Sequence, residues 1–268
     1  MIDIALDDEA SSQNEGKPFE QLVGVASQQP FPLGEMRMSR AAWDQLWLIR
    51  RRGIFARVGR APGVTDELRA LGLLDRLGGL TPAGEGLLRV RATAKIVFGV
   101  LADTGGRRRI LNSWYSGREA LIVAELPLPD GSTVMSIHST TMSASFGLLI
   151  SWMRIGPAWA FAHGEGRSEF DADLIAHRID AAPGHEPALP EGASWMTARA
   201  WSAGEWTRYT VASPQAGIKY EAIRTGDVGW FQPEELPDGR VRLAVVSGTD
   251  VMRNTVELFF DTVAALRK

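Results

Sequence analysis

The residue types that usually carry catalysis or bind metals are few in this chain, and they are not arranged for either task. The chain has 4 histidines and no cysteine, which excludes a thiol nucleophile, a disulfide framework and a cysteine metal site. No two histidines have the i, i+4 spacing of a zinc-binding helix. His138 falls in a predicted strand, where a core or edge role is favoured. His163 with Glu165, and His185 with Glu186, place a carboxylate near an imidazole, but only as neighbours in loops.

Motifs of the common enzyme classes are also missing from the sequence. There is no Gly-x-Ser-x-Gly elbow, no Walker A sequence and no Gly-x-Gly-x-x-Gly. Asp171 and Asp173 lack the glycine and the glutamate of a calcium loop and suit the start of a helix. We therefore expect a protein that is not an enzyme and that holds no metal or cofactor. A hydrolase with a spatially assembled site is the third alternative.

One stretch of the chain occurs twice. Pro129, Asp130 and Gly131 match Pro237–Gly239, 108 residues later, and apolar runs flank both copies. An Asp-Gly pair between such runs is typical of a β-hairpin. Each copy predicts strand, turn, strand, Asp-Gly turn, strand and helix. We predict an α+β protein with a central antiparallel sheet made from two pseudo-twofold βββα repeats.

Three helices are expected before the first repeat, in a winged-helix-like segment. Ser39 is a suitable N-cap for a helix over 39–58. Thr65 is expected to cap a second helix that ends near Gly72. Thr81 and the following proline open a third, which is expected to run to about Leu101.

The chain then divides into four predicted parts. They are a disordered acidic tail (1–35), the helices with the first repeat (36–155), an irregular helical connection (156–205) and the second repeat (206–268). The last helix is expected to begin near Asp250 and to bury one apolar stripe. Its members are Met252, Val256, Phe259, Phe260, Val263 and Leu266.

Positive charge is concentrated in residues 37–109, with 15 Lys+Arg against 6 Asp+Glu, although the whole chain has a net charge of −3. This split suggests a basic face for an acidic partner or a nucleic acid. Ion pairs with the acidic remainder of the chain would explain it equally well. Residues 71–88 resemble a sequence pattern that is common in winged-helix domains: the end of a helix, a Gly-Leu pair and a helix that begins at Leu-Thr. The recognition helix of such a domain would offer only Arg69 here for base readout. A winged-helix DNA-binding regulator is the runner-up, and nucleic acid is the less favoured partner.

The N-terminus lacks the basic and apolar regions of a signal peptide. The longest apolar segments are too short to span a bilayer. We expect a cytoplasmic protein with no membrane insertion.

The order of these elements resembles the EspG family, which are cytosolic chaperones associated with type VII (ESX) secretion in actinobacteria. The similarity spans about Met38 to the C-terminus. It rests on the helix over 39–58, the sequence pattern from Leu71 to Pro82, the strand pair within 109–126 and the closing segment from Gly229 to Leu266.

The resemblance implies a non-catalytic binding protein that keeps a helical secretion substrate soluble until delivery. In that family the client contacts a hairpin of the sheet and the helical part beside it. The matching positions here are Leu128, Pro129, Asp130, Ser132, Trp152 and Met153. The acidic tail and the short 127–132 hairpin depart from the family and leave the identity of the client open. A homodimer formed through an exposed strand edge is also left open.

The 9 tryptophans suit a protein that covers apolar surface on another protein, because Trp supplies a large contact area and a hydrogen-bond donor. Trp43, Trp47 and Trp230 fall on predicted buried faces. The candidates for an exposed patch lie in the irregular middle of the chain. They are Trp159, Trp195, Trp201 and Trp206.

Overall fold

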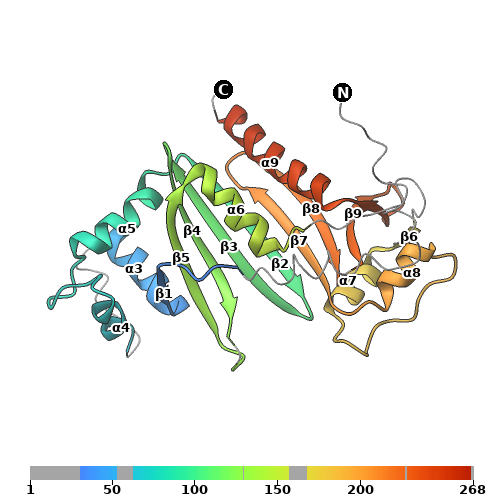
Figure 1. Ribbon diagram of the computed structural model, residues 1–268, viewed down its shortest axis with the longest axis horizontal. Helices are drawn as coiled ribbons and strands as arrows, with labels where there is room; N and C mark the ends of the chain where they lie inside the picture. The colour runs from blue at the N-terminus through green and yellow to red at the C-terminus, as the bar shows by residue number, and fades with distance from the viewer. Residues whose placement is uncertain (1–30, 53–62, 129, 157–167, 227, 267–268) are drawn as a thin grey trace, which may run out of the picture.

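A single ten-stranded antiparallel sheet is the framework of the molecule (Figure 1). The computed structural model describes residues 31–52, 63–128, 130–156, 168–226 and 228–266. The strands are β1 (Met36–Met38), β2 (Ile96–Thr104), β3 (Arg107–Ser116), β4 (Glu119–Pro127), β5 (Thr133–Thr141), β6 (Ser168–Asp171), β7 (Trp206–Ser213), β8 (Ile218–Thr225), β9 (Gly229–Glu235) and β10 (Arg240–Val246). The helices of these residues are α3 (Arg40–Arg52), α4 (Val64–Ala70), α5 (Pro82–Thr93), α6 (Met142–Met153), α7 (Ala172–Asp180), α8 (Trp195–Trp201) and α9 (Gly248–Ala265).

The strand order is symmetric about the middle of the sheet. It runs β1-β5-β4-β3-β2-β7-β8-β9-β10-β6, so two four-stranded meanders meet where β2 pairs with β7. In that pairing Gly99 lies opposite Ala212, and Asp103 lies opposite Arg208. Each meander is followed by a helix, α6 or α9, and is extended by a short outer strand. The α+β class with a central antiparallel sheet, predicted from the sequence, is confirmed.

Each half of the sheet has four strands, whereas the sequence predicted three. The prediction extended the third helix to about Leu101, because apolar residues there keep helical spacing. The helix α5 ends at Thr93 instead, and β2 begins at Ile96. Alternate residues of β2, such as Phe98 and Val100, are fully buried, which is the period of a strand and not of a helix.

The two Asp-Gly sequences form the same turn. In the first, the Leu128 N–H donates to the Ser132 carbonyl at 2.8 Å; in the second, 108 residues later, the Leu236 N–H donates to the Arg240 carbonyl at 2.8 Å. Gly131 has φ 83° and Gly239 has φ 81°, a conformation that glycine adopts without steric cost. Descent of the two halves from one ancestor stays a prediction.

The two faces of the sheet carry different helices, and β4 shows how the sequence separates them. Ala120 and Ile122 pack in the cluster that α6 and α9 complete. Leu121 and Val123 alternate with them and pack in the cluster that α3, α4 and α5 complete. The far half of this second face is covered by α7 and α8, around Trp206 and Phe231. Figure 1 shows α6 and α9 side by side across the middle of the sheet, with the other helices at its two ends.

The helix starts agree with the sequence at two of three places. The Ser39 hydroxyl accepts from the Ala42 N–H at 3.1 Å, and the Thr81 hydroxyl accepts from the Gly84 N–H at 3.2 Å. Thr65 is not a cap, because α4 begins one residue earlier and its N-cap is Gly63. Residues 53–58, which were predicted to continue the first helix, lie outside the described residues.

The predicted tail over 1–35 is described only from residue 31 onward. Phe31 makes an edge-to-face contact with His138, with ring centroids 5.1 Å apart. The Gly34 N–H donates to the Ser136 hydroxyl at 2.7 Å. Residues 31–35 are therefore packed on β5, on the face that α6 covers.

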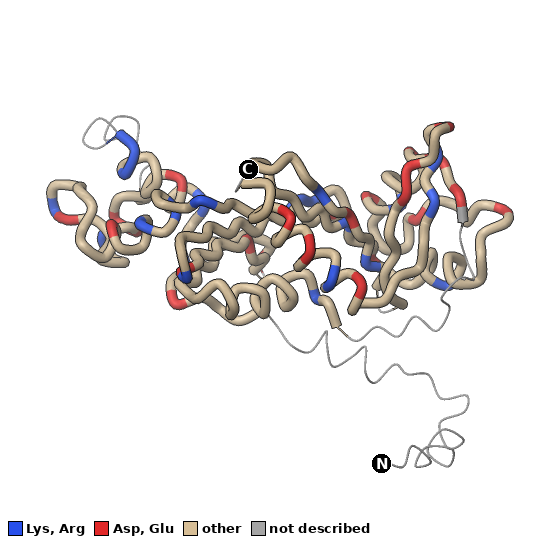
Figure 2. Tube along the Cα trace, turned by 90° about the horizontal axis from the view of Figure 1, so that it is seen from above, with Lys and Arg blue, Asp and Glu red and all other residues tan. Residues whose placement is uncertain are grey.

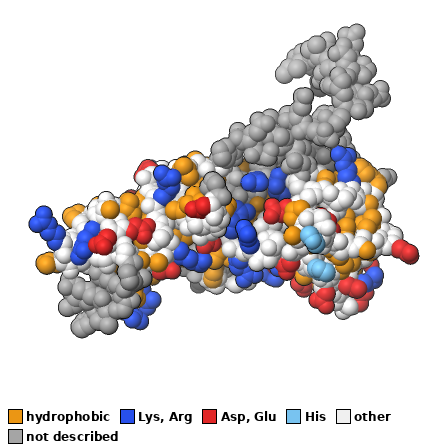
Figure 3. Space-filling view, turned by 90° about the horizontal axis from the view of Figure 1, so that it is seen from below, with side chains coloured by type: hydrophobic (Ala, Val, Ile, Leu, Met, Phe, Trp, Pro, Cys, Tyr) orange, Lys and Arg blue, Asp and Glu red, His pale blue; other side chains and the backbone are white. Residues whose placement is uncertain are grey.

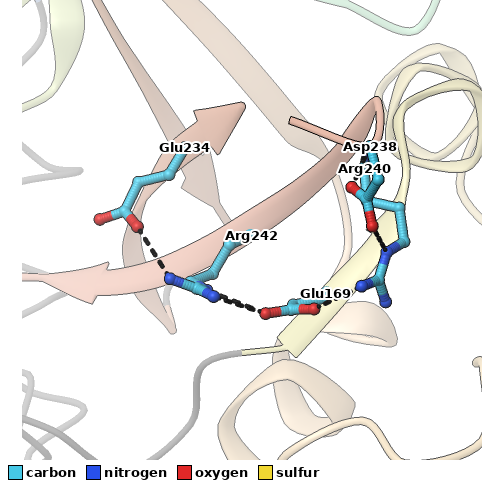
Figure 4. A network of polar contacts seen from close by, with 5 residues as sticks. All are labelled: Glu169, Glu234, Asp238, Arg240 and Arg242. Atoms are coloured by element: carbon cyan, nitrogen blue, oxygen red, sulfur yellow. Dashed lines mark hydrogen bonds and ion pairs between the residues drawn. The ribbon is translucent and has the colours of Figure 1, made fainter. Parts of the chain in front are cut away.

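A network of ion pairs fastens β6 to the sheet (Figure 4). Both carboxylate oxygens of Glu169 are used: Arg242 Nη2 lies 2.6 Å from Oε1, and Arg240 Nη2 lies 3.0 Å from Oε2. Arg242 also reaches Glu234 at 3.8 Å, and Arg240 pairs with Asp238 at 2.7 Å. The irregular connection predicted over 156–205 thus contributes a strand as well as the helices α7 and α8.

None of the described helices is both long enough and apolar enough to cross a membrane.

Arg178 is a buried cation whose loss we expect to be costly. Its guanidinium donates to the Trp201 carbonyl at 2.6 Å and to the Gly204 carbonyl at 2.6 Å, and it lies over the Trp206 ring. Replacing Arg178 with Met leaves both carbonyls without these donors. We expect Arg178→Met to lower the free energy of unfolding by about 2–3 kcal/mol in denaturant titrations. Arg52→Met, at an exposed position, is the control and should change stability by less than about 0.5 kcal/mol.

Candidate protein-binding surface

The hairpin between β4 and β5 is exposed, and its polar side chains hold its shape. Asp130 Oδ1 accepts from the Ser132 N–H at 2.9 Å and from the Ser132 hydroxyl at 2.6 Å. These bonds, the hydroxyl first, lower the pKa of the Asp130 carboxyl, because they favour its charged form. Leu128 is 37% exposed and is the apolar contact that the described part of this loop offers. Pro129 lies outside the described residues.

Two of the residues predicted for the client surface are core residues. Trp152 is 3% exposed and Met153 is fully buried. Trp152 Nε1–H donates to the Glu125 carbonyl at 3.3 Å, and its ring contacts Tyr209 at 6.1 Å. The prediction that Trp152 and Met153 contact a client directly is therefore wrong. The sequence placed them at the end of an apolar helix but did not show which side of that helix faces the sheet.

Of the predicted stripe, the C-terminal helix α9 buries Phe259, but its other fully buried positions are different ones. Its buried positions include Val251, Thr255 and Thr262, and the two threonine hydroxyls donate to the carbonyls four residues earlier at 2.8 Å. This internal bonding satisfies the hydroxyls, so threonine can occupy the core side of a helix. Met252 and Phe260, which were predicted to be buried, are 43% and 61% exposed.

On the side of α9 next to Phe259 lie the exposed Met252 and Phe260 and the half-buried Val256. Met252, Val256 and Phe260 follow at intervals of four, so they share one side of the helix. Phe259 is next to this side, and its ring contacts the Phe146 ring of α6 at 5.1 Å. We group Phe146, Gly147 and Ile150 of α6 with Met252, Val256 and Phe260 of α9, because the Phe146–Phe259 contact joins the two helices here. We call these six residues the α6–α9 seam.

The seam is free of charge along α6. Within its 12 residues, MSASFGLLISWM, the helix α6 has no acidic or basic side chain. A helix that is apolar on all sides is normally buried on all sides, but Ser143, Ala144 and Gly147 are exposed. A Cβ built on Gly147 would meet no atom within 4 Å, so a second helix could approach this side closely. The lack of charge over 142–153 is the sequence signal that could have identified this surface.

The tryptophan candidates for an exposed patch are mostly core residues as well. Trp201 is 4% exposed and Trp206 is fully buried, and their indole N–H groups donate to the carbonyls of Pro187 and Ala200 at 2.7 and 2.9 Å. Trp195 is 58% exposed. Trp159 lies outside the described residues. Trp43 and Trp230 are buried and Trp47 is half-buried, as predicted.

The basic region over 37–109 is partly neutralised within the chain. Arg40 pairs with the buried Glu125 at 2.7 Å, and Arg89 pairs with Glu119 at 2.7 Å; both carboxylates lie on β4. Arg91 lies over the Trp47 ring at 4.0 Å, and burial lowers its pKa to about 10. Figure 2 shows acidic and basic residues interspersed along the molecule.

The segment proposed as a DNA-recognition helix is short, and its basic side chain is engaged locally. The helix α4 has 7 residues. Arg69 donates to the Arg76 carbonyl at 3.1 Å and to Asp66 Oδ1 at 3.3 Å. The geometry gives no support to base readout by Arg69.

Two features bear on the alternative of an assembled catalytic site. His138 is 8% exposed, and burial lowers its pKa; its Nε2 lies 3.2 Å from the Ser136 hydroxyl. A cavity of about 430 Å³ lies between α7 and strands β7 to β10. The residues that line it include Arg208, Lys219 and Glu221 and no histidine, serine or threonine. No cluster of metal-binding side chains occurs among the residues that the structure describes.

Comparison with known proteins finds a structural similarity only. No protein-family model matches the chain, and no curated protein matches it in sequence. The chain is similar in structure to a chaperone of a type VII secretion system. That chaperone is EspG5 of Mycobacterium tuberculosis, in a structure of its complex with a PE25-PPE41 dimer. The match has 9% sequence identity and a TM-score of 0.43, and it covers 85% of this chain and 96% of the other.

The hydrogen bonds within the 128–132 loop predict a pH effect that can be measured directly. Because the folded-state pKa of Asp130 lies below its ordinary value, the bonds stabilise the loop at neutral pH and are lost as the pH falls through that folded-state pKa. In Ser132→Ala the hydroxyl bond is gone, so we expect the pKa of Asp130 to rise toward its ordinary value in a 13C NMR titration of the carboxyl. Asp238, which Arg240 holds in the other turn, should keep its titration midpoint and is the internal control.

Proposed function

We propose that this protein is a non-catalytic chaperone or adaptor that binds a helical protein client on the α6–α9 seam. The observation that carries the proposal is the uncharged helix α6 beside an exposed apolar row on α9. Phe260 and Met252 keep 61% and 43% of their surface exposed. Full burial of each side chain would stabilise the fold by about 1.5–3 kcal/mol, and the fold does not use this gain. Exposed apolar patches of this kind mark sites for partners.

The shape of the seam favours a helix as the client. Two antiparallel helices present parallel rows of side chains, and a third helix can set its own ridge between them. The small residues on α6, Ser143, Ala144 and Gly147, permit a close approach of the two backbones. Aromatic anchors such as Phe260 then supply most of the contact energy.

The hairpin of β4 and β5 supplies the second part of the proposed site. The Trp152 indole bonds to the Glu125 carbonyl of β4, so the last turn of α6 lies near the end of β4 from which the hairpin extends. Leu128 offers an apolar contact, and Asp130 and Ser132 keep the loop in one conformation before the client arrives. A preformed loop lowers the entropic cost of binding.

The class of client follows from the resemblance to the EspG family noted in the sequence. It implies a helical substrate of type VII secretion that is kept soluble in the cytoplasm until delivery. The seam and the hairpin fit such a task because both recognise exposed apolar surface and neither performs chemistry.

Placing a charge in the seam should abolish binding of the client. The tagged chain is purified from its native cell and the retained helical partner is identified by mass spectrometry. The affinity of that partner is then measured with purified components. We expect Phe260→Glu to weaken binding at least tenfold, or about 1.4 kcal/mol, because the charge would be desolvated in the interface. Leu77→Glu, at a 77% exposed position outside the seam, is the matched control. Equal affinity of both variants would contradict the proposal.

The hairpin is tested separately by changing its two polar residues. Replacing Asp130 and Ser132 by arginine should abolish client binding while the melting temperature stays nearly unchanged, because both side chains are exposed. The measurement pairs isothermal titration with the client and differential scanning calorimetry. Unaffected binding would remove the loop from the site and leave the seam as the whole contact surface.

A further inference from the structure

Three arginines act by their charge on one buried tyrosine, Tyr209, on the face that α6 and α9 cover. The Arg109 guanidinium lies over the Trp152 ring at 5.5 Å, and that ring contacts Tyr209 at 6.1 Å. Arg154 closes α6 in a left-handed conformation with φ 56°. Arg224 is on β8, opposite Trp230, whose ring contacts Tyr209 at 5.5 Å. We call Arg109, Arg154 and Arg224 the arginine cluster.

The cluster acts as a local positive field. Burial raises the pKa of Tyr209, and all three arginines oppose that rise, whereas Glu205 adds to it. Among the described residues, neither Arg109 nor Arg154 forms an ion pair with a carboxylate. Figure 3 shows several Lys and Arg side chains in the middle of the face seen from below, with Asp and Glu side chains among them. A group of side chains with charge of one sign attracts a segment of the opposite charge.

The same chain contains a strongly acidic segment directly before its first described residue. Residues 1–30 hold six Asp and Glu against one Lys. The segment also carries apolar residues, among them Phe19, Leu22 and Val23. It joins the fold at Phe31, which contacts His138 on β5 and packs against the core under α6 and α9. The acidic segment therefore starts on the face that carries the arginine cluster.

We propose that the acidic N-terminal segment docks in cis on the arginine cluster and covers the adjoining end of the α6–α9 seam. The reach suffices. From β5 to β8 there are five steps between neighbouring strands, or about 24 Å at ~4.8 Å a step. About eight extended residues cover that span at ~3.3 Å each. Glu20 and Glu15, which are 11 and 16 residues before Phe31, can both arrive at the cluster.

Docking in cis gives the seam an occupant when no client is present. It places carboxylates beside the three arginines and shields exposed apolar side chains from other proteins. A client would then have to displace a weakly bound segment. The binding of that segment depends on charge and weakens as the salt concentration rises. This inference goes beyond the proposed function, and its test requires no client, so either can fail without the other.

The absence of cysteine from the chain allows a direct test by cross-linking. Full-length protein with Gln21→Cys and Ser151→Cys is treated with a short bis-maleimide, and the intramolecular product is quantified by peptide mapping. Ser151 lies in the last turn of α6, three residues before Arg154. The control pair is Gln21→Cys with Ala83→Cys, an exposed position on α5 beyond the other face of the sheet. We expect at least a fivefold higher yield for the first pair at low salt, and equal yields at 1 M salt.

Charge reversal separates docking from mere proximity. Glu15→Lys with Glu20→Lys changes only the segment, so it should reduce the yield of the first pair to that of the control. Arg109→Glu with Arg154→Glu should do the same, provided that the melting temperature is retained. Equal yields for both pairs would overturn the proposal, as would a yield that ignores charge reversal. Products that link two copies of the chain would overturn docking in cis.

Discussion

The antiparallel pairing of β2 with β7 is the contact on which the rest of the structure depends. Five residue pairs, from Gly99–Ala212 to Asp103–Arg208, turn two separate meanders into one sheet. Within it Val100 lies opposite Val211, and both are fully buried. Without this ladder neither half could bury its helix, because α6 and α9 share a single core across the join.

An aromatic cluster above the join holds the two helices in place. The Phe259 ring of α9 contacts Phe98 of β2, Tyr115 of β3 and Phe146 of α6, with centroid distances of 6.0, 5.0 and 5.1 Å. Such contacts contribute roughly 0.5–1.5 kcal/mol each beyond the area they bury. Because a ring of the second half is held by three rings of the first, the spacing of α6 and α9 is fixed by the core. A partner would therefore meet a surface already arranged for it.

The features that the sequence predicted correctly are those that depend on a few neighbouring residues. The Asp-Gly turns at Gly131 and Gly239 follow from a backbone conformation that glycine tolerates best, and the caps at Ser39 and Thr81 need only the next three residues. The start of β2 could not be found in this way. Val90, Ala94, Val97 and Leu101 fit a helix, and only contacts with β3 and β7 make 96–104 a strand.

The candidate surface was missed for a related reason. Met252 and Phe260 were predicted to be buried, and Thr255 and Thr262 were not part of the predicted stripe. The helix is rotated the other way because the threonine hydroxyls bond to their own helix and the small side chains fit close to the strands. Trp152 is the opposite case: it was predicted to contact a client but is buried. Its place in the core depends on a hydrogen bond to a carbonyl of β4. Which side of a helix faces inward is decided by the shape of what it covers.

The outermost strands of the sheet have a consequence for the behaviour of the protein at high concentration. A long bare strand is a template for further strands, which is how sheets grow into fibrils. Here β1 has only 3 residues and β6 only 4, and each is followed at once by a helix. The outermost strands of this wide sheet are thus too short to act as long templates for stacking of molecules edge to edge, while the apolar surface that the protein presents lies on the face of the sheet.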